Sequence, residues 1–166
     1  MMKNKWYLCL VLMLLMIFCF QSSATAESDI KPINIALFNP VQIFDADTSI
    51  HGFRLNLIYG VNKDVNGLDL GLVNHATGYA NAFQWGLVNL VDGNFSGWQA
   101  GVVNVVGGTA VGLQTGFFNS AKEFRGLQLC VVNMTDKLHG LQIGVLNFNW
   151  SGDPLTFFPI INFSFY

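Results

Sequence analysis

Hydrophobic and polar positions between Gly67 and Asn147 repeat six times with almost the same spacing. Within each copy, apolar residues alternate with Gln, Gly and Asn, and this period of two predicts β-strands. The starts of successive copies lie 15, 15, 15, 14 and 14 residues apart, so one short structural unit is used several times. The copies are GLDLGLVN (Gly67–Asn74), AFQWGLVN (Ala82–Asn89), GWQAGVVN (Gly97–Asn104), GLQTGFFN (Gly112–Asn119), GLQLCVVN (Gly126–Asn133) and GLQIGVLN (Gly140–Asn147).

Two degenerate copies precede the clean ones, and a strand-like segment, Leu155–Tyr166, follows them. That last segment is rich in Phe and Ile, which favour strands. After the N-terminal region, no segment has the period of an α-helix, so we predict an all-β fold. The degenerate copies are Ile33–Asn39, with Asn34 and Ala36 at the Gln and Gly positions, and Gly52–Tyr59, with Arg54, Asn56 and Tyr59 at the Gln, Gly and Asn positions.

Turn signals between the copies favour an antiparallel meander. Asp92-Gly93 and Gly107-Gly108 are typical of two-residue hairpin turns. A turn at Asp92-Gly93 places Gln84 opposite Gly101, and such pairing of large with small residues fills small barrels. One face then carries Gly and Gln and the other carries apolar side chains, as in outer-membrane-type barrels. We therefore predict an up-and-down meander that closes into a small barrel of about 8–10 strands.

A β-solenoid with one 14–15-residue coil per repeat is the alternative architecture. It would stack Asn in an internal ladder, and it does not require an even number of strands. The nine strand-like segments and their short apolar stretches fit a membrane barrel poorly. A solenoid would, however, expose an apolar row that a soluble surface rarely tolerates. This row is Val88, Val103, Phe118, Val132 and Leu146.

The Gln positions of the repeats predict a polar row inside the barrel. Arg54 and Asp69 occupy this position in consecutive copies, and we expect them to be adjacent because a buried charge needs a partner. The alternative is that both are exposed and unrelated. The predicted row is Arg54, Asn56, Asp69, Gln84, Gln99, Gln114, Gln128 and Gln142, and the border of each repeat is marked by Asn74, Asn89, Asn104, Asn119, Asn133 or Asn147.

Residues 1–26 have the pattern of a secretory signal peptide. Lys3 and Lys5 precede an apolar run that is too short to span a bilayer, and Ala24-Thr25-Ala26 is typical of a cleavage site. We expect cleavage after Ala26, which leaves residues 27–166 as a single β-repeat domain.

Charge and cysteine content then exclude two classes of protein. Removal of two of the eight Lys and Arg residues leaves six against ten Asp and Glu, a net charge of −4. This balance argues against a nucleic-acid partner. Only Cys130 of the three cysteines remains, so the mature chain has no internal disulfide framework.

No motif in the sequence points to catalysis, a metal or a cofactor. His51, His75 and His139 are scattered without the spacing of metal ligands. The chain has no Gly-x-Ser-x-Gly elbow, no phosphate-binding loop and no Cys-x-x-Cys pair. We therefore predict that the protein is not an enzyme.

The repeats resemble a family of small exported bacterial proteins with tandem GLQLGLVN-type surface repeats. The resemblance extends from Ile33 to the C-terminus and includes GFRLNLIYGVN (Gly52–Asn62) and FFPIINF (Phe157–Phe163). It implies a location at the cell surface or envelope, and it implies no activity. We expect export across the inner membrane, a place in the outer membrane or at the cell surface, and a structural or adhesive role with membrane lipid as partner. The alternative is an exported barrel or solenoid that binds a small ligand or another partner.

Overall fold

The computed structural model describes residues 30–165, which form eleven strands and no helix within that range. The predicted signal peptide and its cleavage site lie outside these residues. The strands are β1 (Ile30–Phe38), β2 (Val41–Gln42), β3 (Ser49–Asn62), β4 (Val65–Ala76), β5 (Ala80–Trp85), β6 (Val88–Val91), β7 (Phe95–Ala100), β8 (Val103–Thr115), β9 (Phe118–Leu129), β10 (Val132–Asn149) and β11 (Phe157–Ser164). The all-β prediction is confirmed.

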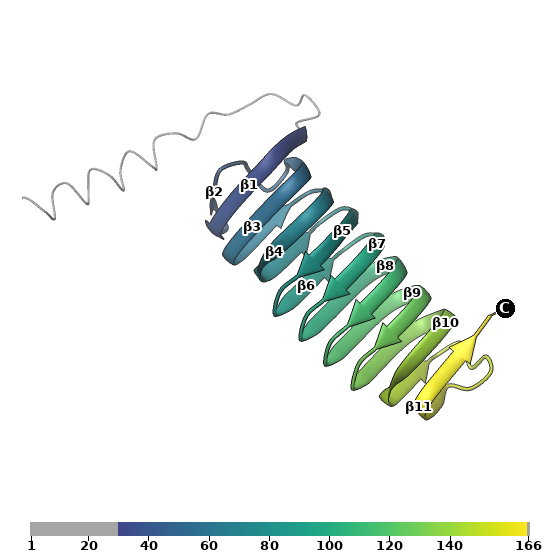
Figure 1. Ribbon diagram of the computed structural model, residues 1–166. Coiled ribbons are helices and arrows are strands. Elements are labelled where there is room, and N and C mark those ends of the chain that lie inside the picture. Colours follow the sequence, from purple (N-terminus) through teal and green to yellow (C-terminus); the bar gives the residue numbers. More distant parts are fainter. Residues whose placement is uncertain (1–29, 166) are drawn as a thin grey trace, which may run out of the picture.

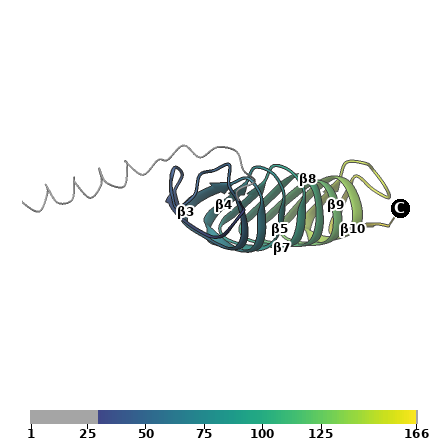
Figure 2. The same ribbon diagram turned by 90° about the horizontal axis from the view of Figure 1, so that it is seen from above.

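Neighbouring repeats pair in parallel and in register, so equivalent residues of successive copies lie side by side. Gln99 pairs with Gln84 on one side and with Gln114 on the other. The chain forms a β-solenoid of about eight turns, stacked along one axis from β1 to β11 (Figures 1 and 2). The prediction of an antiparallel barrel is therefore wrong, and the solenoid alternative is confirmed.

The chemistry of the amide side chain explains why the parallel register is favoured. A Gln side chain carries both a donor and an acceptor, so stacked Gln residues can satisfy one another. Pairing Gln84 with Gly101 would leave each buried amide without that partner. Asp92-Gly93 and Gly107-Gly108, which were expected to form hairpin turns, instead form corners between coils. The Gly93 N–H donates to the Gly78 carbonyl at 2.9 Å, and the Gly108 N–H donates to the Gly93 carbonyl at 3.0 Å.

Each coil consists of two extended legs joined by two corners. In the coil that begins at Phe95, the first leg is β7 and the second is Val103–Val106, the start of β8. The corner Gly101-Val102 joins these legs, and Gly107-Gly108 leads into the next coil. A Cβ at Gly101 would lie 2.6 Å from the Gly86 carbonyl oxygen, so a larger residue at position 101 would force the two coils apart locally.

The interior of the solenoid has an apolar half and an amide half. The amide half lies beside the corner Gly101-Val102, where Gln99 and Asn104 are fully buried. The apolar half lies beside the other corner and alternates large with small side chains. Its members are Val65, Ala76, Ala80, Val91, Phe95, Val106, Ala110, Ala121, Phe124 and Leu138. The amide half therefore depends on hydrogen bonding, and the apolar half on packing and the hydrophobic effect.

The two ends of the solenoid interrupt the parallel stacking. At the N-terminal end, β2 folds back antiparallel against β1, which itself pairs in parallel with β3. At the C-terminal end, β11 pairs antiparallel with β10. Because an open strand edge can recruit other chains, these reversals cover part of the edge that β1 and β10 would present.

In the second degenerate copy, the predicted placement of Tyr59 at the Asn position is wrong. The register shifts between Asn56 and Tyr59, so Gly60 pairs with Asn74 in place of Tyr59. Asn56 does occupy the Gly position, opposite Gly71. Its side chain fills the space above Gly60, where an added Cβ would overlap the Asn56 amide. Asn56, which occupies the Gly position, thus supplies the buried asparagine that this copy lacks at its Asn position.

Candidate functional site

The predicted polar row lies inside the solenoid rather than inside a barrel. Its Gln side chains are fully buried and form a ladder in which each Nε2 donates to the Oε1 of the preceding coil at 2.7–2.9 Å. Asn162 of β11 lies at the C-terminal end of the ladder, with its Nδ2 3.5 Å from the Gln142 Oε1. The ladder comprises Gln84, Gln99, Gln114, Gln128 and Gln142.

A buried ion pair stands at the N-terminal end of the Gln ladder. Gln84 Nε2 donates to Asp69 Oδ2 at 2.8 Å, and Arg54 donates to both carboxylate oxygens of Asp69 at 2.7 Å. Arg54 lies directly opposite Asp69, as the expected adjacency requires, and neither side chain is exposed. The Arg54 guanidinium can only donate hydrogen bonds, so the side chain stacked on it in the next coil must accept them. The Asp69 carboxylate does so.

The Asn residues of the repeats form a second ladder inside the solenoid, not a border. Each Nδ2 donates to the Oδ1 of the following coil at 2.7–3.2 Å. Asn56 begins this ladder and also donates to Asp69 Oδ1 at 3.1 Å, so it links the two ladders. The remaining members are Asn74, Asn89, Asn104, Asn119, Asn133 and Asn147, all fully buried.

The two ladders run in opposite directions. Gln amides donate toward the N-terminal end of the solenoid and Asn amides toward the C-terminal end, so their side-chain dipoles oppose each other. Direct hydrogen bonds join the amides within each ladder, so no ligand fits between them. Binding at the Gln row, as in a small binding barrel, is therefore not compatible with this interior.

Charged side chains gather at the corner that contains Gly107-Gly108, which we call the charged corner. Here Arg125 donates two hydrogen bonds to Glu123 and thereby lowers the pKa of that half-buried carboxyl. His75 forms one hydrogen bond at each ring nitrogen, with the Tyr59 hydroxyl at 3.0 Å and with Asp92 of the charged corner at 3.1 Å. The charged corner comprises Lys63, Asp64, Asp92, Lys122, Glu123, Asp136 and Lys137.

The opposite corner of every coil carries an outward apolar side chain. Leu87 is 53% exposed, Phe117 is 58% exposed and Val145 is 60% exposed, and no charged residue interrupts the row. We call this row the apolar ridge. It consists of Leu57, Leu72, Leu87, Val102, Phe117, Val131 and Val145. A solvent-facing row of this length is the kind of surface that marks an interaction site.

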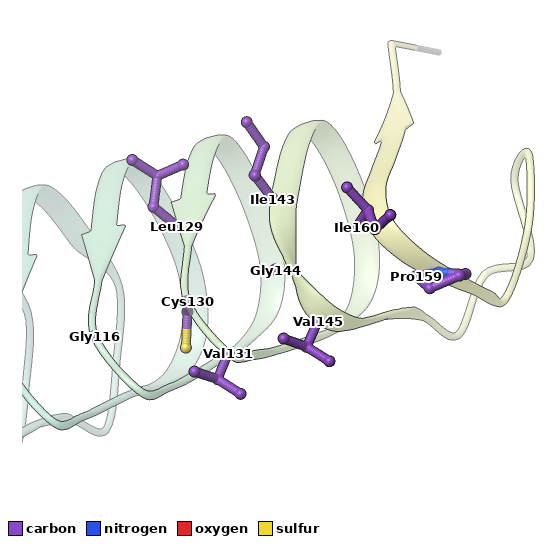
Figure 3. Close-up of a pocket in the computed structure, with 9 residues that line it drawn as sticks. All are labelled: Gly116, Leu129, Cys130, Val131, Ile143, Gly144, Val145, Pro159 and Ile160. Carbon is purple, nitrogen blue, oxygen red and sulfur yellow. The ribbon is translucent and has the colours of Figure 1, made fainter.

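A lengthwise trough runs beside the apolar ridge. Its floor is the row of corner residues Gly71, Gly86, Gly101, Gly116, Cys130 and Gly144, and its far wall is formed by outward residues of the first legs. Two cavities lie along it, with volumes of about 310 Å³ near Gly86 and about 550 Å³ near Gly144. Figure 3 shows the larger one, with Leu129 and Ile143 on one side and Val131 and Val145 on the other.

The sequence analysis did not identify the ridge or the trough. The signal was present, because every copy places an apolar residue directly after its second Gly or the Cys that replaces it. In an antiparallel barrel this residue is one more member of an outward apolar face. In a solenoid it lies at a corner and projects from the molecule.

Groups that could carry chemistry are not brought together. His51 and His139 lie in one row of first-leg positions, far apart because Asn66, Asn81, Ser96, Val111 and Arg125 lie between them, and His75 lies in a different row. Within residues 30–165 no group of three His, Cys, Asp or Glu side chains could hold a metal ion. Cys130 is partly buried, and burial raises the pKa of its thiol. The most extensive feature among residues 30–165 is therefore the exposed apolar surface of the ridge and trough.

No protein-family model, curated protein or solved structure matches this chain. Among residues 30–165, no helix is long and apolar enough to cross a membrane. Its function is therefore inferred from its own residues.

Proposed function

We propose that this protein is a non-enzymatic, exported β-solenoid of the cell envelope that binds membrane lipid through its apolar ridge, in a structural or adhesive role. The observation that carries the proposal is the separation of charged and apolar side chains to opposite corners of the coils. Such an amphipathic arrangement is typical of elements that lie in a membrane interface. Export is supported by the signal-peptide pattern at the N-terminus.

The magnitude of the hydrophobic effect favours binding to an apolar phase. Full burial of one large aliphatic side chain contributes roughly 1.5–3 kcal/mol. The ridge presents six aliphatic side chains and Phe117 on one line, and Trp85 and Trp98 are also more than 40% exposed on the adjoining first legs. Together these contributions can exceed the entropic cost of holding the protein at a surface.

The attraction that we propose is hydrophobic, not electrostatic. The chain after residue 26 carries a net charge of −4, and three of its six cations, Lys63, Lys122 and Lys137, are mixed with carboxylates at the charged corner. Binding should therefore be similar for neutral and anionic vesicles and should resist high salt, which screens electrostatic attraction.

Flotation of the natively processed protein with phosphatidylcholine vesicles tests the proposal. The double variant Leu87→Asp, Val102→Asp should lose most of the floated fraction, because two carboxylates would enter the apolar phase. Thr77→Asp, an exposed position at the charged corner, is the matched control and should float like the wild type. Circular dichroism establishes that each variant is folded. The proposal is wrong if the wild type stays at the bottom of the gradient, or if both variants bind equally well.

A further inference from the structure

We propose that the trough beside the apolar ridge holds one acyl chain of a membrane phospholipid, lying lengthwise along the solenoid. This inference rests on the proposed function and specifies which part of the lipid the protein holds. It concerns a defined groove and not the general apolar surface.

The same three rows of residues line the trough at both cavities. The smaller cavity is lined by Trp85 and Ala100 on the first-leg side, and the larger by Leu129 and Ile143 at the equivalent positions. Corner residues form the floor of both, and residues of the apolar ridge form the other wall. The cavities thus lie over consecutive stretches of the same rows, the smaller over Gly71, Gly86 and Gly101 and the larger over Gly116, Cys130 and Gly144.

The chemistry of the trough selects a hydrocarbon. No charged side chain lines either cavity. The floor N–H groups are already bonded to the next coil: Gly86 to the Ala100 carbonyl at 3.1 Å, Gly101 to the Thr115 carbonyl at 3.0 Å, and Gly116 to the Leu129 carbonyl at 3.1 Å. These backbone N–H groups are therefore not free to bind a ligand headgroup, whereas an alkyl chain needs no such donors.

The length of the trough selects a linear chain. Coils stack at the strand spacing of about 4.8 Å, so the five steps from Gly71 to Gly144 cover about 24 Å. One leaflet of a bilayer has a hydrocarbon depth of about 15 Å, which is half of the 30 Å core. An extended acyl chain therefore fits within the trough, and the apolar ridge places that trough at the surface where such chains are found.

The C-terminal strand closes one end of the trough. Pro159 and Ile160 of β11 line the larger cavity beyond Gly144 (Figure 3). Ile160 has a φ of +72°, a left-handed conformation that a β-branched residue rarely adopts. Residues held in such conformations cluster at ligand clamps and other functional sites. Ile160, which has this conformation, forms the end wall of the larger cavity.

Filling the trough without removing its apolar character tests the inference. Ala100→Phe fills the smaller cavity, and Ile143→Trp, on the first-leg side and outside the apolar ridge, covers the larger one beside Gly144. Val111→Phe adds a phenyl group at an exposed position outside the trough and is the matched control. The natively processed proteins are incubated with phosphatidylcholine vesicles and separated from them, and the phospholipid that remains on the protein is measured by native mass spectrometry.

We expect the wild type and Val111→Phe to retain phosphatidylcholine in stoichiometric amount. The two filled variants should retain roughly tenfold less, while they still float with vesicles. The inference is overturned if the wild type floats but retains no phospholipid, if all variants retain it equally, or if free fatty acid is held in its place. Retention of phospholipid by a wild type that does not float would support the trough and contradict the proposed function of the ridge.

Discussion

At the residue scale, the carboxylate of Asp69 connects the buried charge of Arg54 to both amide ladders. It accepts two hydrogen bonds from Arg54, one from Asn56 and one from Gln84. A carboxylate offers about four lone-pair sites, so its capacity is filled. Removing it would leave Arg54 as a buried cation without a counter-charge.

We predict that Asp69→Ala lowers the free energy of unfolding by about 3–5 kcal/mol, the cost of leaving one partner of a buried pair uncompensated. Urea unfolding followed by circular dichroism measures this change. Asp136→Ala is the control, because Asp136 is exposed at the charged corner, and it should change stability by less than about 1 kcal/mol.

The double variant Arg54→Gln, Asp69→Gln should recover much of the lost stability, because Gln at both positions extends the ladder by two coils. Full recovery is not expected, since Arg54 also donates to the His75 carbonyl at 2.9 Å. A double variant less stable than Asp69→Ala would contradict the view that position 69 serves as the acceptor for Gln84.

Cys130 gives a second prediction at the residue scale. Burial raises its pKa above the ordinary value of 9.0, so the folded state holds the thiol proton more tightly than the unfolded state does. The resulting stabilisation is complete below the ordinary pKa and is lost as the pH rises through the raised value. The wild type should therefore lose stability relative to Cys130→Ser as the pH rises above about 9 in urea unfolding. Parallel pH profiles for the two proteins would contradict this prediction.

At the scale of the element, one coil is the unit of stability. Each coil contacts only its two neighbours, through backbone pairing, the two ladders and the alternation of large and small core residues. Phe95 lies between Ala80 and Ala110 in this alternation. Stability in such arrays is close to a sum of coil terms and interface terms.

Duplicating residues 82–111, which span two coils, should therefore give a folded and more stable solenoid. The insertion preserves the register of both ladders and places Phe95 and its copy between alanines. Duplicating only residues 82–88 inserts half a coil and should prevent folding, because Gln would no longer stack on Gln. Thermal unfolding followed by circular dichroism distinguishes these results. Equal behaviour of the two insertions would contradict the coil as the unit.

At the scale of the whole molecule, the coils stack into one elongated body (Figure 1). The charged corner and the apolar ridge occupy opposite corners of these coils. The proposed function therefore requires one orientation at a membrane, with the ridge directed into the lipid and the charged corner into water. A protein that adhered non-specifically would show no such preference.

This orientation can be measured with an environment-sensitive fluorophore in a Cys130→Ser background. A label on Phe117→Cys of the ridge should shift its emission to shorter wavelength when vesicles are added, because it enters an apolar phase. The same label on Lys137→Cys of the charged corner should show no shift. Similar shifts at both positions would contradict a fixed orientation.

The sequence by itself determined the features that depend on local spacing. The period of two identified strands, and the spacing of 14–15 residues identified the repeating unit, because both are written in residue types that alternate between inside and outside. The equivalence of Arg54 and Asp69 with the Gln positions also followed from spacing alone. Their partnership was expected because an unpaired buried charge is costly.

Only the tertiary structure decided how the repeats pair. Gln84 can be placed opposite Gly101 in an antiparallel hairpin or beside Gln99 in a parallel stack, and turn signals at Asp92-Gly93 and Gly107-Gly108 are compatible with both. The parallel stack prevails because identical amides satisfy one another across coils, at 2.8 Å between Gln99 and Gln84. In the parallel stack the Asn residues lie in the interior and the chain turns at corners between the legs. The apolar ridge and its trough therefore arise from the pairing of repeats and cannot be read from a single repeat.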